Sequence, residues 1–136
     1  MERKLVHVGI AVKSLATSVP LFAKLFPQDT VPVEEVADQG VTVAFFRTGA
    51  CSVELTEATE PDSPVGRFLA KRGEGVHHLS FQVDDLQAEL DRLRGEGFIL
   101  IDEKPRQGAG GYLIAFLHPS STNGVLIELS QKQGKG

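Results

Sequence analysis

The sequence contains an internal repeat, and no other feature restricts the fold of this 136-residue chain as strongly. Three segments of the first half align with three segments of the second half: 7–15 with 78–86, 43–46 with 114–117, and 53–55 with 127–129. The first two pairs share an offset of 71 residues and the third has an offset of 74, since the turn around Asn123-Gly124 adds three residues. The repeat predicts two copies of one supersecondary unit.

Each copy has the pattern of one strand, one helix and three further strands. Period-2 alternation predicts first strands over residues 6–12 and 77–83, and an amphipathic pattern predicts helices over 15–26 and 85–96. The other strands are expected at 31–35, 42–47 and 52–56 in the first copy, and at 99–103, 113–117 and 125–130 in the second. The expected fold class is therefore α+β, built from two tandem βαβββ modules.

We expect a single domain, because a chain of this length is typical of one. Its two modules cover about 5–57 and 76–131, and the segment 58–75 connects them. Asp62 or Ser63 is a suitable N-cap and Pro64 a suitable first residue for a short connecting helix that ends near Gly73.

The composition excludes several classes of protein. With 14 Lys and Arg against 18 Asp and Glu, the chain has a formal charge of −4, so nucleic acid is not an expected partner. The single cysteine, Cys51, excludes an internal disulfide framework and a zinc site built from cysteines. No apolar run approaches the ~20 residues of a membrane span. We expect a cytoplasmic protein with no membrane partner.

Four side chains with metal-ligand chemistry occupy equivalent positions in the two copies. His7 and His78 begin the first strand of each copy, and Glu54 and Glu128 lie in the last strand, each between two apolar residues. Alternation along a strand turns these side chains away from the layer packed on the helices. If a pseudo-two-fold axis relates the copies, two imidazoles and two carboxylates converge on one site. Such a donor set suits Co²⁺, Ni²⁺, Mn²⁺, Zn²⁺ or Mg²⁺.

Taken singly, each of these residues has a simpler interpretation. A histidine at a strand start is more often a hydrogen-bonded structural residue, and a strand glutamate is usually solvated. Their symmetric recurrence favours the metal site instead. His77 competes with His78 for the ligand role, but the repeat alignment selects His78, and alternation directs His77 to the opposite face. His118, just before Pro119, is expected to be a loop residue or a substrate contact.

A further likeness covers nearly the whole chain, and the segments that carry it are 7–12, 39–45, 62–65 with 68–78, 83–85, 105–111 and 116–129. The most specific parts are GEGVHH at 73–78, FLHP at 116–119 and GVLIEL at 124–129. On these motifs the chain resembles the vicinal oxygen chelate superfamily, which includes glyoxalase I, extradiol dioxygenases and bleomycin-resistance proteins. Within it, the chain is most similar to the methylmalonyl-CoA epimerase family.

The resemblance implies a curved mixed sheet around a metal site, with His7, His78 and Glu128 as ligands. It places Glu54 where family members carry Gln or Glu as the remaining ligand. It implies an isomerase that interconverts (R)- and (S)-methylmalonyl-CoA, between propionyl-CoA carboxylation and the cobalamin-dependent mutase. The implied cofactor is a divalent metal ion, Co²⁺ before the others, and the implied assembly is a homodimer that takes a small acyl-CoA substrate.

The implied reaction removes a proton next to a thioester, where a Lewis-acidic metal would stabilise the enolate. Epimerisation needs two acid/base groups or one mobile group, and Glu128 is the first candidate. Some family members carry a Glu in the strand after the Gln-Gly pair, but this chain has Val43 there. Glu54 is therefore the candidate for the second acid/base group, and a water molecule or Glu35 are weaker candidates.

A glycine-rich loop at 107–111 could hold a phosphate or carboxylate through its backbone N–H groups. Lys104 adds positive charge nearby. The residues expected to contact the substrate are Arg106, Gly108, Gly110, Gly111 and His118. The alternative for this loop is a flexible turn between strands.

Two other functions compete with the epimerase. Glyoxalase I, a lactoylglutathione lyase, moves a proton next to a carbonyl with a similar His and Glu site, so the metal residues alone do not separate it from the epimerase. A binding protein without enzymatic activity is the second alternative. Such members tend to lack the metal residues and bind planar ligands between aromatic walls, whereas this chain has all four polar residues, no Trp and one Tyr.

Overall fold

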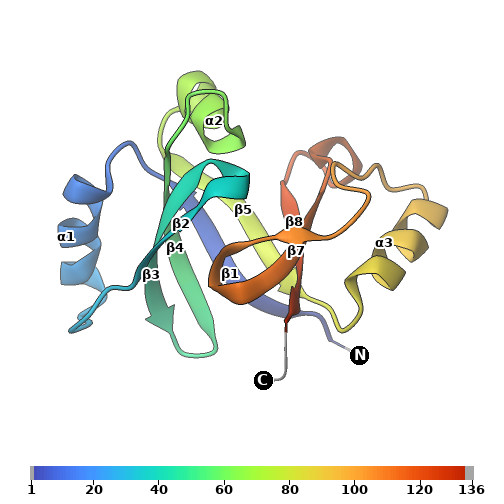
Figure 1. Cartoon of the computed structure of the whole chain (residues 1–136), viewed down its shortest axis with the longest axis horizontal. Helices are drawn as coiled ribbons and strands as arrows, with labels where there is room; N and C mark the ends of the chain where they lie inside the picture. Colours follow the sequence, from blue (N-terminus) through green and yellow to red (C-terminus); the bar gives the residue numbers. More distant parts are fainter. Residues whose placement is uncertain (1, 134–136) are drawn as a thin grey trace. The chain divides into compact units, whose positions relative to one another are not determined.

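The computed structural model of the chain describes residues 2–133 (Figure 1). The first copy of the repeat contains β1 (Lys4–Ala11), α1 (Leu15–Leu25), β2 (Val33–Val36), η1 (Ala37–Gln39), β3 (Val41–Thr48) and β4 (Cys51–Ala58). The connecting helix is α2 (Pro64–Arg72). The second copy contains β5 (Gly75–Gln82), α3 (Leu86–Gly95), β6 (Arg106–Gln107), η2 (Ala109–Gly111), β7 (Tyr112–Leu117), η3 (Pro119–Ser121) and β8 (Ile127–Lys132).

The strand pairing is the same in both copies. β1 pairs parallel to β4, and β5 pairs parallel to β8, while the other pairs within each copy are antiparallel. Within the described residues, the strands of the first copy lie in the order β2-β3-β4-β1, and those of the second copy lie in the order β5-β8-β7-β6. The prediction of an α+β fold with two βαβββ modules and a mixed sheet is confirmed.

The chain folds as two compact units. One unit contains His7–His77, and the other contains residues 2–6 and 78–133. Each unit has its own apolar core at equivalent positions of the repeat: Val12, Ala44, Phe46 and Leu55 in the first, and Val83, Ala115, Leu117 and Leu129 in the second. Figure 1 shows α1 and α3 beside the strands of their own copies. Burial of these apolar side chains between helix and strands is the main stabilising term in each unit.

Individual hydrogen bonds recur between the copies. Thr56 Oγ1 donates to Ile10 O at 3.1 Å, and at the equivalent place Ser130 Oγ donates to Phe81 O at 3.4 Å. Each of these bonds ties the last strand of a copy to its first strand. The repeat seen in the sequence is thus a repeat of contacts as well.

The start of the main helix is also held in the same way twice. The backbone N–H of Leu15 donates to Glu57 Oε1 at 2.7 Å, and that of Leu86 donates to Gln131 Oε1 at 2.8 Å. A side chain from the end of the last strand therefore satisfies one of the N–H groups that the first turn of a helix leaves unpaired.

The connecting helix has the predicted start and end. Ser63 is the N-cap of α2 and accepts from the N–H of Gly66, and Pro64 is its first residue. Gly73 ends the helix with φ at +79°, a conformation that favours glycine. None of the helices within 2–133 combines the length and the apolar character that crossing a bilayer would need.

The strand expected at 99–103 is the one element that the sequence analysis predicted wrongly. Only an isolated bridge joins Leu100 to Leu117, and the paired strand at this edge is β6. The N–H groups of Ile101 and Asp102 both donate to Phe116 O, and the Asp102 carboxylate accepts from the N–H of Phe116. A side chain has taken the place of a backbone partner, which interrupts the ladder at this point.

Candidate active site

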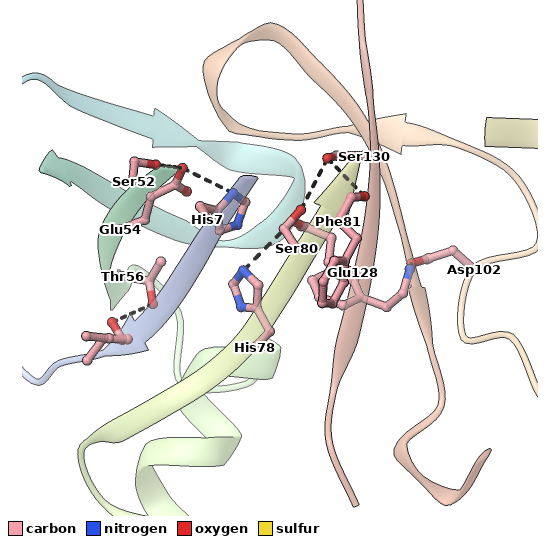
Figure 2. A network of polar contacts seen from close by, with 12 residues as sticks. His7, Ser52, Glu54, Thr56, His78, Ser80, Phe81, Asp102, Glu128 and Ser130 are labelled. Carbon is pink, nitrogen blue, oxygen red and sulfur yellow. Dashed lines mark hydrogen bonds and ion pairs between the residues drawn. The ribbon is translucent and has the colours of Figure 1, made fainter. Parts of the chain in front are cut away.

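The first copy places three polar side chains next to one another on β1 and β4. The parallel register sets His7 beside Ser52 and Gly9 beside Glu54. His7 Nδ1 lies 3.2 Å from Glu54 Oε2, and Ser52 Oγ donates to the same oxygen at 3.2 Å. Figure 2 shows this row of side chains, with Glu54 between Ser52 and His7. Glu54 is buried.

The second copy pairs the equivalent histidine and glutamate. The register of β5 and β8 sets Ser80 beside Glu128, and His78 Nε2 lies 3.9 Å from Glu128 Oε1 (Figure 2). The ring of Phe116 meets the His78 imidazole edge-to-face, with 5.5 Å between centroids. Glu128 is 3% exposed and His78 7%, so both groups are removed from bulk water.

The chemistry of these two pairs suits a cation. A buried ionised carboxylate is costly unless a positive charge or hydrogen-bond donors accompany it, and here each buried carboxylate lies next to an imidazole. Imidazole nitrogens and carboxylate oxygens are common ligands of divalent metals. The structure thus brings each predicted histidine together with its predicted glutamate, His7 with Glu54 and His78 with Glu128.

His77 lies in a different environment from His78. Its ring meets Phe68 of α2 edge-to-face, with 5.0 Å between centroids, and the guanidinium of Arg72 lies 5.8 Å from the centre of the Phe68 ring. His77 was expected on the face of the strand opposite to His78, and it packs against α2 while His78 lies beside Glu128.

The glycine-rich loop has a packing function that the sequence did not reveal. The N–H of Gly108 donates to Tyr112 O at 2.9 Å, and a Cβ added to Gly108 would lie 2.7 Å from Ile114 Cγ2. Gly110 has φ at +69° and Gly111 at +78°. Arg106 Nε lies 3.6 Å from Asp102 Oδ1, which anchors the side chain just before the loop.

His118 caps the short helix η3. Its Nδ1 accepts from the N–H of Ser120 at 3.0 Å, and its own N–H donates to Ile99 O. His118 was expected to be either a loop residue or a substrate contact, and these hydrogen bonds are those of a loop residue.

Val43 is a buried apolar residue of the first unit. It is 2% exposed on β3, between Glu34 of β2 and Thr56 of β4. The weaker candidate Glu35 lies opposite Thr42 in the same pairing. The residue that sequence reasoning missed is Ser52, although its spacing of two from Glu54 on one strand already implied that the two side chains share a face.

The chain is similar to known proteins over most of its length. The model of the Glyoxalase/Bleomycin resistance protein/Dioxygenase superfamily matches residues 6–116. The chain is 42% identical over 131 residues to the uncharacterized protein YqjC of Bacillus subtilis, and the match covers 96% of this chain and 94% of that protein. It is 39% identical over 131 residues to the mitochondrial methylmalonyl-CoA epimerase of Dictyostelium discoideum, covering 95% of this chain and 78% of that one.

A solved structure of a methylmalonyl-CoA epimerase in complex with methylmalonyl-CoA and NH4+ superposes with a TM-score of 0.92. The two sequences are 34% identical, and the match covers 98% of this chain and 97% of the other. The likeness therefore extends over both copies of the repeat.

Proposed function

Because the chain belongs to the glyoxalase/bleomycin resistance protein/dioxygenase superfamily, and within it to the methylmalonyl-CoA epimerases, we propose that it interconverts (R)- and (S)-methylmalonyl-CoA. Its relatives make the chain an epimerase and hence an isomerase. The observation that supports methylmalonyl-CoA as the substrate is the match, over 98% of this chain, to an epimerase structure in complex with methylmalonyl-CoA.

We propose that His7, His78 and Glu128 hold a divalent metal ion. Each offers one ligand atom, an imidazole nitrogen or a carboxylate oxygen. Two imidazoles and a carboxylate are a donor set that binds divalent ions while leaving room for a substrate. We propose Co²⁺ first, on the basis of the family. Glu54, expected as the remaining ligand, lies against His7.

The metal, when bound, would supply positive charge next to the thioester oxygen, where negative charge develops as the α-proton leaves. Glu128 is the proton carrier that we propose for one face of the α-carbon, since a carboxylate beside the metal could move between ligation and proton transfer. Glu54 is the carrier that we propose for the other face. The two carboxylates are equivalent in the repeat, which suits reaction on two opposite faces.

We propose that the glycine-rich loop at 107–111 contacts the substrate. Gly110 and Gly111 lie in left-handed conformations, and successive backbone N–H groups in such a loop can bind an anionic group. Gly108, Arg106 and His118 are the other contacts that we propose.

We further propose a homodimer in the cytoplasm that acts between propionyl-CoA carboxylation and the cobalamin-dependent mutase.

Deuterium wash-in tests the proposal. The protein is incubated in D₂O with (R)- or (S)-methylmalonyl-CoA, with and without EDTA, and deuterium at the α-carbon is followed by mass spectrometry. We expect incorporation from both epimers and its loss with EDTA.

A parallel assay with the hemithioacetal of methylglyoxal and glutathione tests the glyoxalase I alternative. Conversion of that compound, with no exchange in methylmalonyl-CoA, would overturn the epimerase proposal. Exchange that continues in EDTA would overturn the metal dependence alone.

A further inference from the structure

Ser52 has no role in the function proposed so far, yet it contacts the centre of the first histidine–glutamate pair. We infer that Ser52 is a positioning residue: it holds the Glu54 carboxylate against His7, and this contact fixes which ring nitrogen His7 presents to the metal. The inference rests on the proposed metal site and deepens it. Ser52, Glu54 and His7 all lie in the same compact unit.

The geometry defines the direction of each hydrogen bond. Ser52 Oγ and His7 Nδ1 both lie 3.2 Å from a single oxygen, Glu54 Oε2. An ionised carboxylate only accepts, so the serine hydroxyl and Nδ1 must both act as donors. A neutral imidazole carries one hydrogen, and if it is on Nδ1, the lone pair is on Nε2. A carboxylate that orients a metal-binding histidine through its second nitrogen is a common arrangement around metal ions.

The repeat shows that this contact is particular to one copy. The residue two positions before Glu128 is Leu126, which has no hydroxyl group to donate, whereas the residue two positions before Glu54 is Ser52. Hydrogen bonds between side chains and the backbone recur between the copies, but a hydroxyl two positions before the glutamate does not. A departure from an otherwise repeated set of contacts is difficult to attribute to the fold alone. It points to a specific task for one oxygen of the Glu54 carboxylate, Oε2, which is to hold the His7 ring.

The experiment compares Ser52→Ala with two matched variants. Ser52→Thr keeps the hydroxyl on the strand, and Cys51→Ala removes a neighbouring side chain that points to the other face. Two quantities are measured: the tautomer of His7 in metal-free ¹⁵N-labelled protein, by long-range ¹H–¹⁵N spectra near pH 8, and the dissociation constant of Co²⁺, by calorimetry. Near that pH an ordinary imidazole is neutral.

In the wild type we expect His7 to carry its hydrogen on Nδ1. Ser52→Ala should produce a mixture of tautomers and weaken Co²⁺ binding about 10-fold, the lower end of what loss of an outer partner of a metal ligand causes. Ser52→Thr should restore both quantities, and Cys51→Ala should change neither. If Ser52→Ala does not fold, Ser52→Cys, whose thiol is a weak donor, takes its place.

Three results would overturn the inference: an Nε2–H tautomer in the wild type, a Ser52→Ala variant with unchanged tautomer, or unchanged Co²⁺ affinity in that variant. These outcomes are independent of the epimerase assay. If the wild type binds Co²⁺ and responds to Ser52→Ala as expected but does not exchange the α-proton of methylmalonyl-CoA, the proposed function fails while the role of Ser52 stands. If the exchange occurs but His7 of the wild type carries its hydrogen on Nε2, only the role inferred for Ser52 fails.

Discussion

At the scale of single residues, the two copies of the repeat assign different surroundings to equivalent groups. Glu54 accepts from a serine hydroxyl on its own strand, whereas Glu128 lies beside His78 and has a leucine two positions before it. Because the environment of a carboxylate decides its basicity, the chemistry of each glutamate has to be tested separately.

Glu128→Gln tests the proposed proton carrier. The amide has nearly the shape of the carboxylate, but it cannot take up a proton and is a weaker metal ligand. We expect deuterium wash-in to fall by about 10³-fold or more, since two functions of one residue are lost together. Glu103→Gln is the matched control, because its side chain is 75% exposed and should leave the rate unchanged. Exchange near the wild-type rate in Glu128→Gln would remove Glu128 from the mechanism.

The repeat explains which site residues the sequence could reveal. His7, His78, Glu54 and Glu128 were found because each has a counterpart in the other copy. Ser52 was missed for the opposite reason, since the alignment sets it against Leu126 and symmetry gives no signal there. The close approach of Gly108 to Ile114 was also missed, because such a contact depends on distances in three dimensions.

At the scale of elements, each main helix is anchored by a side chain from the last strand of its own copy. Glu57 serves α1, and Gln131 serves α3. The two copies therefore contain a natural comparison of a charged and a neutral acceptor at one structural position.

Glu57→Ala and Glu57→Gln separate the hydrogen bond from the charge. Ala removes the acceptor for the N–H of Leu15 and should lower the free energy of unfolding by about 1 kcal/mol, the usual cost of losing a side chain that caps a helix. Gln is the residue that the second copy uses, so Glu57→Gln should keep most of that stability. Urea unfolding followed by circular dichroism measures both. Equal losses in the two variants would show that charge, and not hydrogen bonding, holds the helix.

A pH-dependent contribution to stability comes from α3. The hydrogen bond from Arg92 is the main cause that lowers the pKa of Glu89 to about 2, and Arg3 adds to it. A lowered pKa in the folded state stabilises the fold above the unfolded-state pKa, and this stabilisation is lost as the pH falls towards 2. Since both arginines are substantially exposed, the gain is about 1 kcal/mol or less.

Glu89→Gln should therefore be less stable than the wild type at pH 7, and the difference should shrink between about pH 4.5 and pH 2. Thermal unfolding of both proteins across this range checks the expectation. Added salt should reduce the difference at pH 7, because it screens exposed charges. A difference that grew on acidification would contradict the assigned direction of the pKa shift.

The elements themselves were largely predictable, because alternation and helical spacing repeat at an offset of 71 residues, or 74 after the turn around Asn123-Gly124. The failure at 99–103 has a local cause. Residues 99–101 form a short apolar run that suggests a strand, but the Asp102 side chain accepts the N–H of Phe116 in place of a backbone carbonyl. Polarity patterns contain no information about which group will satisfy a particular N–H.

At the scale of the whole molecule, the proposed metal ligands come from both copies of the sequence repeat. His7 belongs to the first copy, and His78 and Glu128 belong to the second. A ligand that binds the folded but not the unfolded chain stabilises the fold according to its concentration relative to the dissociation constant.

Removal of the metal should therefore lower the melting temperature. With Co²⁺ at about 100 times its dissociation constant, binding adds about 2.7 kcal/mol of stability. Calorimetric scans of chelator-treated protein, with and without added Co²⁺, measure the shift. The double variant His7→Ala/His78→Ala is the control, and its melting temperature should not respond to Co²⁺. An equal shift in that variant would place the stabilising ion elsewhere.

The compact units do not follow the order of the chain, and this affects how the protein is made. The unit that contains His78 and Glu128 also contains the residues before His7, and the Arg3–Glu89 ion pair joins positions 86 apart. During translation, this unit stays incomplete until the ribosome has released the residues around Glu128, although the segment before His7 was synthesised long before them. The segment before His7 can therefore pack only after the residues from His78 onward have been synthesised. If the chain were cleaved within 58–63, neither of the two fragments would contain all the residues of that unit.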